Sequence, residues 1–298
     1  MRNHPLFVLF SLALIVVVIG KYVIIAQTGV TGEWTATVST KEAGKIQLNL
    51  ERQTARGGHN QHGSSFSLDE LQGLSRDQTQ NGNVSFRLVR EAGTIDFRGA
   101  FTNGRGAGTF TFSPNGGFVD AMRSRGFDFD KQSSKGDGSA EDRLFTAAMV
   151  NVTTALADDL RSANFGNLGV EDLFKAAIFK VDGKFMAEMK STGFPNLGME
   201  DLVKARIFKI DADYVRQVRD MGFASEDFEG LVKFRIFKVT PDFLSEIKAE
   251  GFGDLSAEDI VKFRIFKLDR DFIREAKAEE PNITVEGLVQ RRIGVRRR

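Results

Sequence analysis

The sequence contains no cysteine among its 298 residues. This absence excludes disulfide bonds, thiolate-bound zinc and cysteine nucleophiles, and it excludes a lipid anchor attached to an N-terminal cysteine. It does not determine the redox compartment, because an exported protein can fold without disulfides. The formal net charge is only +1, so no overall electric field indicates nucleic acid or an acidic substrate as the partner.

Histidine is scarce as well, with three residues in the chain. His59 and His62 stand three positions apart in the segment "RGGHNQHGSS". Such a pair could hold a metal ion weakly, but no cysteine exists and no local carboxylate completes a ligand set. We therefore predict that this segment is a solvated loop, and we predict no metal site.

Catalytic motifs are nearly absent. The sequence has no HExxH, GxSxG or Walker loop. The segment "SEIK" (Ser245 to Lys248) matches the SxxK of some serine enzymes, yet no SDN or KTG motif accompanies it. We therefore predict that the protein is not an enzyme and that it has no catalytic residues and no cofactor. The alternative is an unrecognised hydrolase.

A long apolar run is confined to the N-terminus, where Leu6 to Ile19 follow Arg2. The length of this run is typical of a signal-peptide core and short for a membrane span. Counted through Lys21, the segment could instead span a membrane, with the lysine reaching the interface. The sequence thus predicts that residues 1–26 are a signal peptide cleaved after Ala26, or an uncleaved inner-membrane anchor formed by residues 6–26. Either reading predicts a periplasmic or other extracytoplasmic protein.

Residues 27–114 read as an antiparallel β domain. Apolar residues alternate with polar ones in "EWTATV", in "KIQLNLE" and in the segment that follows Asn83. The dipeptide Asn103–Gly104 stands where a tight hairpin needs residues that tolerate positive φ. We expect a small barrel or a sandwich of about five to seven strands, with Trp34 in its core.

Residues 115–298 are dominated by an internal repeat. The segment "LVKFRIFKVTPDF" (Leu231 to Phe243) returns as "IVKFRIFKLDRDF" at Ile260 to Phe272, and the period of 29 residues aligns four full units. Each unit reads as two short helices, with Ser256 and Thr240 as N-caps, Pro241 in a first turn and Gly251 as a stop. Short helices need neighbours, so the pattern predicts an α-solenoid. The predicted fold class is α+β: an N-terminal signal or anchor helix, a small antiparallel β barrel or sandwich, then an α-solenoid of 29-residue two-helix repeats.

Several positions recur in every full unit. Spacing predicts that the recurring isoleucines are core residues, and that truncating one costs about 2–5 kcal/mol. A glutamate four residues before a lysine predicts an ion pair within each first helix. A further lysine ends that helix, where a cation favours the helix dipole, or else these basic positions line a binding surface. The recurring phenylalanines are predicted to pack between units, or else to form an exposed ladder for a partner. These four sets are Ile178, Ile207, Ile236 and Ile265; Glu171/Lys175, Glu200/Lys204, Glu229/Lys233 and Glu258/Lys262; Lys180, Lys209, Lys238 and Lys267; and Phe179, Phe208, Phe237 and Phe266.

Three arginines follow no evident capping or core rule. They are Arg206, Arg235 and Arg264, and the first full unit has Ala177 at the same position. A solenoid presents the same side-chain rows at successive steps, which suits an extended partner. We therefore predict that these arginines bind an unidentified protein partner.

The repeats of residues 165–280, which read "FxNLSxEDLVKxRIFKVTPDFIxExKAxGF", resemble helical repeats of bacterial envelope proteins associated with BlaR-type regulatory membrane metallopeptidases. The segment from Leu68 to Pro114 is similar to the β segment that precedes those repeats. The resemblance implies a role in envelope signalling or sensing. The metallopeptidase part with its zinc-binding helix is missing, so a proteolytic role is not implied. The resulting hypothesis is an exported binding or scaffolding protein, with a membrane-anchored sensor subunit of an envelope signalling system as the alternative.

Overall fold

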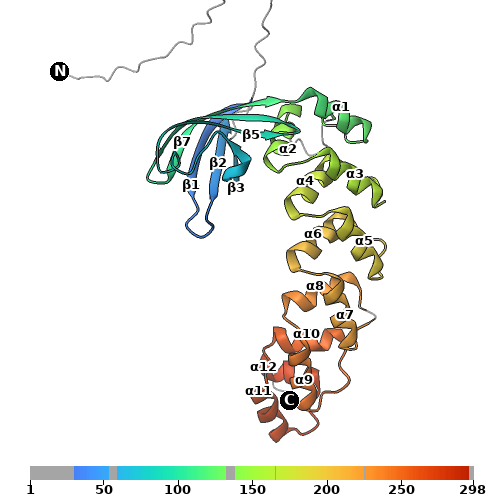
Figure 1. Ribbon diagram of the computed structural model, residues 1–298. Coiled ribbons are helices and arrows are strands. Elements are labelled where there is room, and N and C mark those ends of the chain that lie inside the picture. The colour runs from blue at the N-terminus through green and yellow to red at the C-terminus, as the bar shows by residue number, and fades with distance from the viewer. Residues whose placement is uncertain (1–29, 54–58, 132–137, 165, 225, 295–298) are drawn as a thin grey trace, which may run out of the picture.

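The computed structural model describes residues 30–53, 59–131, 138–164, 166–224 and 226–294. Strands come first along the chain and helices follow, so the fold is mixed α+β (Figure 1). The predicted signal peptide or anchor at residues 1–26 lies outside the described residues. In the part of the chain that the structure describes, no helix is both long enough and apolar enough to cross a membrane.

The strands form one curled antiparallel sheet, a half-barrel of seven strands within the described residues. The order across the sheet is β3-β2-β1-β7-β6-β5-β4. The bounds are β1 (Thr31–Val38), β2 (Lys45–Gln53), β3 (His59–Ser67), β4 (Leu71–Gln72), β5 (Asn81–Arg90), β6 (Gly93–Thr102) and β7 (Arg105–Pro114). Because β3 and β4 are the two edges of this sheet among the described residues, the half-barrel is open. The predicted antiparallel β domain is confirmed, whereas the sheet is neither a complete barrel nor a sandwich in the described residues. An edge strand as short as β4 offers too few hydrogen bonds to close a barrel. The predicted solvated loop around His62 is also wrong, because this residue lies in β3 and pairs with Leu50 of β2.

The hairpin between β6 and β7 confirms the predicted turn. Thr102 pairs with Arg105, and the two residues between them have φ of 50° at Asn103 and 75° at Gly104. Positive φ at both central positions matches the right-handed twist of the flanking strands. Local sequence therefore determines the register between β6 and β7.

The sheet buries one face, as the alternation predicts. Trp34 is 1% exposed, and its Nε1 donates a hydrogen bond to the carbonyl of Arg98 (3.2 Å). Its ring lies over Gly99 and Gly106, where a Cβ atom would stand 2.7 Å from ring carbons. Two glycines on adjacent strands are needed here because any side chain would push the indole ring out of the core. The other residues of this face include Val84, Phe86, Leu88, Ile95, Phe97, Phe101, Phe110 and Phe112.

Twelve short helices follow in the described residues. They are α1 (Gly116–Ser124), α2 (Ala140–Met149), α3 (Thr154–Ser162), α4 (Val170–Phe179), α5 (Gly183–Ser191), α6 (Met199–Phe208), α7 (Ala212–Asp220), α8 (Phe228–Ile236), α9 (Pro241–Ala249), α10 (Ala257–Ile265), α11 (Arg270–Glu279) and α12 (Val285–Arg292). The predicted caps are confirmed. Ser256 accepts a hydrogen bond from the backbone of Asp259, Thr240 accepts one from Phe243 with Pro241 in the first turn, and Gly251 has φ 87° after α9.

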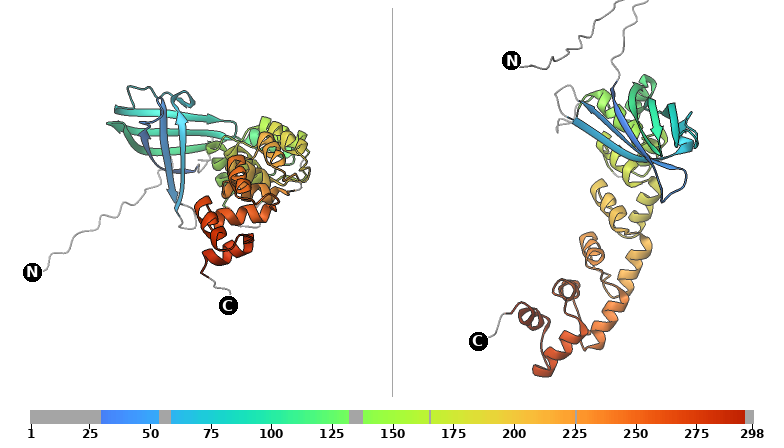
Figure 2. Two further views of the ribbon diagram at one scale, coloured as in Figure 1. Left: turned by 90° about the horizontal axis from the view of Figure 1, so that it is seen from below. Right: turned by 90° about the vertical axis from the view of Figure 1, so that its left-hand side faces the viewer.

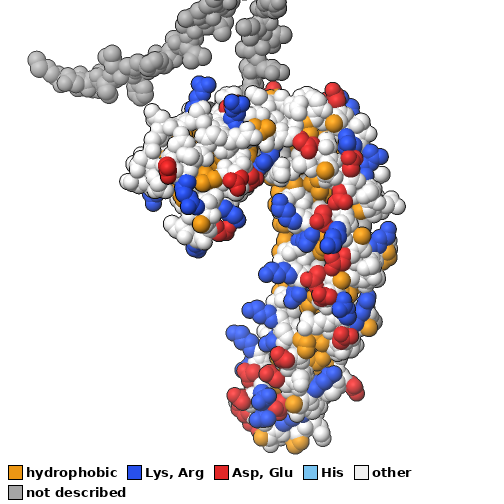
Figure 3. Space-filling view, in the orientation of Figure 1, with side chains coloured by type: hydrophobic (Ala, Val, Ile, Leu, Met, Phe, Trp, Pro, Cys, Tyr) orange, Lys and Arg blue, Asp and Glu red, His pale blue; other side chains and the backbone are white. Residues whose placement is uncertain are grey.

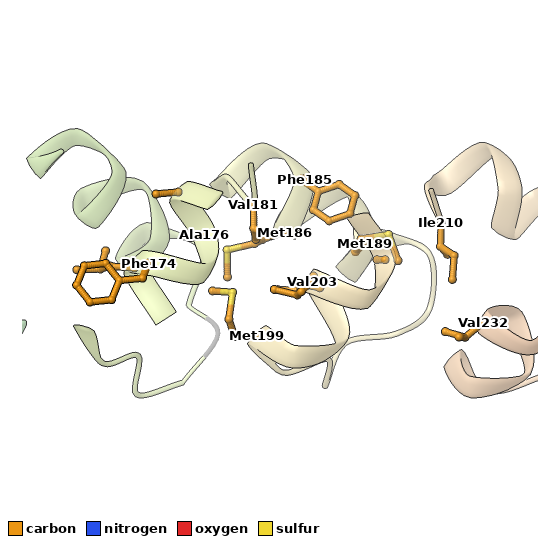
Figure 4. Close-up of a cluster of buried hydrophobic side chains, with 14 of the residues drawn as sticks. Phe174, Ala176, Val181, Phe185, Met186, Met189, Met199, Val203, Ile210 and Val232 are labelled. Carbon is orange, nitrogen blue, oxygen red and sulfur yellow. The ribbon is translucent and has the colours of Figure 1, made fainter. Parts of the chain in front are cut away.

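The helices stand in two rows. From α1 to α8, even-numbered helices line the side toward the sheet and odd-numbered helices form the outer row (Figure 1). The column bends into an arc with the even-numbered row on its inner side (Figure 2). Buried side chains of one helix pair meet those of the next, as Met186 and Met189 of α5 do with Met199 and Val203 of α6 (Figure 4). No helix of this length is stable alone, so this contact between successive pairs holds the column together.

A buried ion pair joins the sheet to the helices. Arg52 of β2 lies 2.5 Å from Asp142 of α2, and their side chains are 7% and 20% exposed. Beside them the ring of Phe145 stacks on Phe110 of β7, with ring centroids 5.5 Å apart. The edge of the His62 ring meets the same phenyl ring at 5.4 Å. The hydrophobic core therefore continues from the sheet into the first helices without a break.

Candidate interaction surface on the even-numbered helices

The recurring isoleucines are exposed, so the prediction that they are core residues is wrong. We call Ile178, Ile207, Ile236 and Ile265 the isoleucine row, and they are 52%, 53%, 49% and 48% exposed. On α6, Leu202 and Ala205 are fully buried and define the face that is turned into the core. Ile207 lies about 140° around the helix from Leu202, since each residue turns the chain by about 100°. Four helices carry an isoleucine at this position, and no helix or strand of the described structure packs over it.

Polar residues share this exposed face. Glu200 and Lys204 of α6 lie on the same side as Ile207, away from the odd-numbered helices. In the space-filling view, hydrophobic, Lys and Arg side chains gather along the edge of the helical column that faces the sheet (Figure 3). The inner side of the arc is therefore a mixed apolar and charged surface.

On α2, the first even-numbered helix, the position that corresponds to the isoleucine row is buried. α2 packs against strands β6 and β7. Met149 of α2, which corresponds to Ile178 of α4, is 4% exposed. This helix face is therefore suited to contact with a second element, and it meets one where the sheet is present.

The recurring phenylalanines are half-buried and pack against the core, in agreement with packing between units. Phe179, Phe208, Phe237 and Phe266 all belong to this group. The exposed apolar row of the protein is thus formed by the isoleucines and not by the neighbouring phenylalanines.

Four exposed lysines follow the isoleucine row at a distance of two residues. We call Lys180, Lys209, Lys238 and Lys267 the lysine column, and all four adopt the left-handed conformation with φ between 50° and 58°. Asn151 has φ 58° at this position of the preceding helix pair and Gly294 has φ 78° at the last. Asparagine and glycine adopt this conformation readily, whereas other L-residues are strained by about 1–2 kcal/mol. Among the described residues, no carboxylate lies within ion-pair distance of the four lysines.

Substituting Lys209 by glycine should therefore stabilise the protein by about 0.5–1 kcal/mol, because glycine removes the left-handed strain at a helix end. Lys209→Val should destabilise it by more than about 1 kcal/mol, since a β-branched residue is strongly disfavoured there. Urea unfolding of both variants measures the difference. The matched control is Lys204→Gly in the interior of α6, which should cost about 1 kcal/mol. Equal effects of the two glycines would contradict this account.

The glutamate and lysine positions pair between helices rather than within them. Lys175 of α4 lies 2.5 Å from Glu200 of α6, and Lys204 of α6 lies 2.5 Å from Glu229 of α8. The hydrogen bond to Glu200 raises the pKa of Lys175. Only at α10 does a described pair follow the predicted spacing, with Lys262 at 3.2 Å from Glu258. These exposed pairs contribute little to stability, and they join the exposed faces of successive even-numbered helices with neutralised charge.

The three arginines predicted to bind a partner lie against aromatic rings of the preceding helix pair. Their guanidinium carbons stand 3.7 Å from the Phe185 ring centroid for Arg206, 3.6 Å from Tyr214 for Arg235 and 3.5 Å from Phe243 for Arg264. Arg235 also donates a hydrogen bond to the carbonyl of Lys209 (2.7 Å). Arginine stacks on aromatic faces through its planar, weakly hydrated cation.

This stacking supplies the rule that sequence reasoning missed. Each arginine joins its own helix pair to the previous one, and Arg292 of α12 does the same over Phe272 at 4.0 Å. The signal was available in the sequence, because an aromatic residue stands 21 residues before Arg206, Arg235 and Arg264 and 20 residues before Arg292. Partner binding by Arg206, Arg235 and Arg264 stays a prediction, and the loss of any of them would also disturb packing between units.

Two carboxylates beside the sheet have shifted pKa values, and an arginine pairs with each. Burial alone raises the pKa of Asp142, but the Ser139 backbone N–H and the Arg52 guanidinium together lower it below its ordinary value. Burial likewise opposes the lowered pKa of Glu70, which arises from hydrogen bonds with Ser67 and Arg90. Such charged, paired carboxylates serve structure, whereas a general acid needs a raised pKa.

Of the two histidines in the segment around β3, only His62 has a described side chain. Burial first, and then the charge of Arg52, lowers the pKa of His62, and Asp142 opposes the shift. His59 begins β3, and its side chain lies outside the described ones. Within the described ranges, no group of three or more His, Cys, Asp or Glu side chains is placed to hold a metal ion.

Comparison with protein-family models, curated proteins and solved structures finds no match to this chain. The resemblance to repeats associated with BlaR-type metallopeptidases therefore stays a prediction. The surface of the chain itself is therefore the evidence for its function.

Proposed function

We propose that this chain is an exported, non-enzymatic binding or scaffolding protein whose helices form an α-solenoid of repeated 29-residue, two-helix units. Its inner, even-numbered row is the surface that contacts a protein partner. The half-barrel covers the first unit and leaves the later units free for that partner.

The isoleucine row is the observation that carries this proposal. Four isoleucines about half exposed recur at the same place on four helices. A single exposed apolar residue is ordinary, whereas a regular exposed row indicates an interaction surface. A repeat array presents such rows over a long distance, which suits an extended partner better than a compact substrate.

Export is supported by the sequence, through the basic residue and apolar run of residues 1–26. An extracytoplasmic scaffold without cysteine would fold independently of the redox state of its compartment. The resemblance to envelope repeat proteins supports the same location.

Site-specific photo-crosslinking in the organism that makes the protein tests this function. A photoreactive phenylalanine analogue at Ile207 should give a discrete crosslinked product in the extracytoplasmic or membrane fraction. The matched control is the same analogue at Gln217, an exposed residue of α7 in the outer row, which should give none. Absence of a product at Ile207, equal products at both positions, or recovery of the protein in the cytoplasm would contradict the proposal.

A further inference from the structure

The isoleucine row and the lysine column together define the chemistry of a partner. Each of four helices presents an isoleucine about half exposed and, two residues later, an exposed lysine. Within the described ranges these lysines have no ion pair. An apolar contact and an unpaired cation thus recur together at every step along the inner row.

Lysine stands at these positions at a conformational cost. Asparagine and glycine fill the same left-handed position in the first and last helix pairs, at Asn151 and Gly294. Strained residues of this kind cluster where a binding surface needs a particular side chain. The four central helix pairs, which carry the isoleucine row, are the ones that have lysine.

We infer that the isoleucine row and the lysine column bind an acidic peptide segment in an extended polyproline II conformation, with an apolar residue at every third position. This inference rests on the proposed binding function and adds the chemistry of the partner. Carboxylates of the peptide complement the four lysines, and its apolar residues cover the isoleucines. The surface continues a face that the sheet already covers at α2, where Met149 is buried.

The spacing of packed helices favours this conformation, because successive even-numbered helices contact one another from α4 to α12. Packed helices stand about 8–10 Å apart. A polyproline II segment rises about 3.1 Å per residue with three residues per turn, so one of its faces returns every ~9 Å. A β-strand returns to the same face every ~6.6 Å.

An α-helical partner fits less well, because its face returns every ~5.4 Å. Alternate anchors of such a helix would fall between isoleucines. The same face of these helices carries the Lys175–Glu200 and Lys204–Glu229 ion pairs, which offer such an anchor no apolar contact. A lipid surface is also disfavoured, since these charged groups share the face of the isoleucine row and the row lies on the inner side of an arc (Figure 2).

The test measures binding of labelled peptides to the full chain by fluorescence anisotropy. The probe is the twelve-residue peptide made of four Leu-Glu-Pro triplets, and the controls are a scrambled peptide of the same composition and a peptide with lysine in place of glutamate. We expect the probe to bind at least about tenfold more tightly than either control, and more weakly at high salt. Equal binding of the probe and the scrambled peptide would overturn the inference.

Two protein variants locate the binding site. The lysines are replaced together by asparagine, which keeps the left-handed backbone and removes the charge, as Asn151 shows is tolerated. This variant should bind the probe about tenfold more weakly, whereas replacement by arginine should preserve binding. Replacing the isoleucine row by serine should weaken binding by about tenfold or more, with an unchanged circular dichroism spectrum. The first variant keeps the test valid if the second does not fold. Unchanged binding by the asparagine variant would overturn the inference.

Other occupants give different results. Binding of vesicles of phosphatidylcholine and phosphatidylglycerol, lost in the same variants and without peptide binding, would replace the peptide with a membrane and overturn the inference. Self-association in sedimentation velocity that the serine variant abolishes, without peptide binding, would make the row an interface between copies and overturn it too. A heptad helical peptide that outcompetes the probe would overturn the polyproline II assignment. If the peptide does not bind but Ile207 gives a crosslinked product, the inference about the peptide fails and the proposed binding function stands. If the peptide binds but Ile207 gives no crosslinked product, only the proposed function is refuted.

Discussion

Leu202→Ala should lower the free energy of unfolding by about 2–5 kcal/mol, as expected for a fully buried leucine in a packed interior. Ile207→Ala, five residues further along the same helix, should change it by less than about 0.5 kcal/mol. The reason is exposure, because Leu202 is 0% exposed and Ile207 is 53% exposed. Sequence periodicity alone predicted a large loss for the isoleucine, so the pair of variants separates the two accounts.

Urea unfolding monitored by circular dichroism measures both values. The comparison extends to α10, where Ile260 is fully buried and Ile265 is 48% exposed. Both residues of that pair are isoleucines, so Ile260→Ala and Ile265→Ala remove the same atoms and differ only in environment. Similar losses for the two members of either pair would show that the isoleucine row is covered in solution by another part of the chain or by a second copy.

Asp142→Asn should destabilise the protein by about 3–5 kcal/mol, because it leaves Arg52 charged, buried and without its carboxylate partner. Asparagine keeps an oxygen that can accept the hydrogen bond from the Ser139 backbone, so the helix cap survives and the loss reports the charge. Replacing Arg52 by methionine in the Asp142→Asn protein should restore most of the loss, since no unpaired charge then remains. Thermal and urea unfolding of the two single variants and the double variant give the coupling energy.

Acid sensitivity follows from the same pair. The pKa of Asp142 is lowered in the folded protein, so the stability that it contributes is complete above its ordinary pKa of about 4. It is lost as the pH falls through the lowered folded-state pKa, where the carboxylate takes up a proton. The Asp142→Asn protein should lose this part of the pH dependence. An identical acid-unfolding profile for the wild type and the variant would contradict the ion pair between Arg52 and Asp142 as the link between sheet and helices.

Much of the secondary structure could be predicted from local residue patterns. The alternation of apolar residues around Phe86 and Phe97 predicted their strands and their buried face. The Asn103–Gly104 turn and the caps at Thr240 and Ser256 were predicted because each depends on the residues within a few positions of itself. The way in which the sheet ends was not predictable, since whether β3 meets β4 depends on strand length and curl across the whole sheet.

Neither the exposure of the isoleucine row nor the packing of the three arginines could be predicted from the sequence. Arg206, Arg235 and Arg264 seemed free because the rings that they stack on belong to the preceding helix pair. Lys175 was expected to pair with Glu171 and meets Glu200 instead. Both differences have one cause: the partner of each side chain is 21 to 25 residues away along the chain, and only packing between helix pairs brings it close.

The sequence by itself determined the short helices, their caps, the alternating strands and the residues that recur with a 29-residue period. Periodicity places each side chain around the axis of its own helix, and it predicted that Ile207 is a core residue. Only the tertiary structure decided which residues of α6 are covered, because Leu202 lies in the core shared by neighbouring helices and no described element packs on Ile207. Burial depends on what lies opposite a residue, and that is a property of the assembled chain.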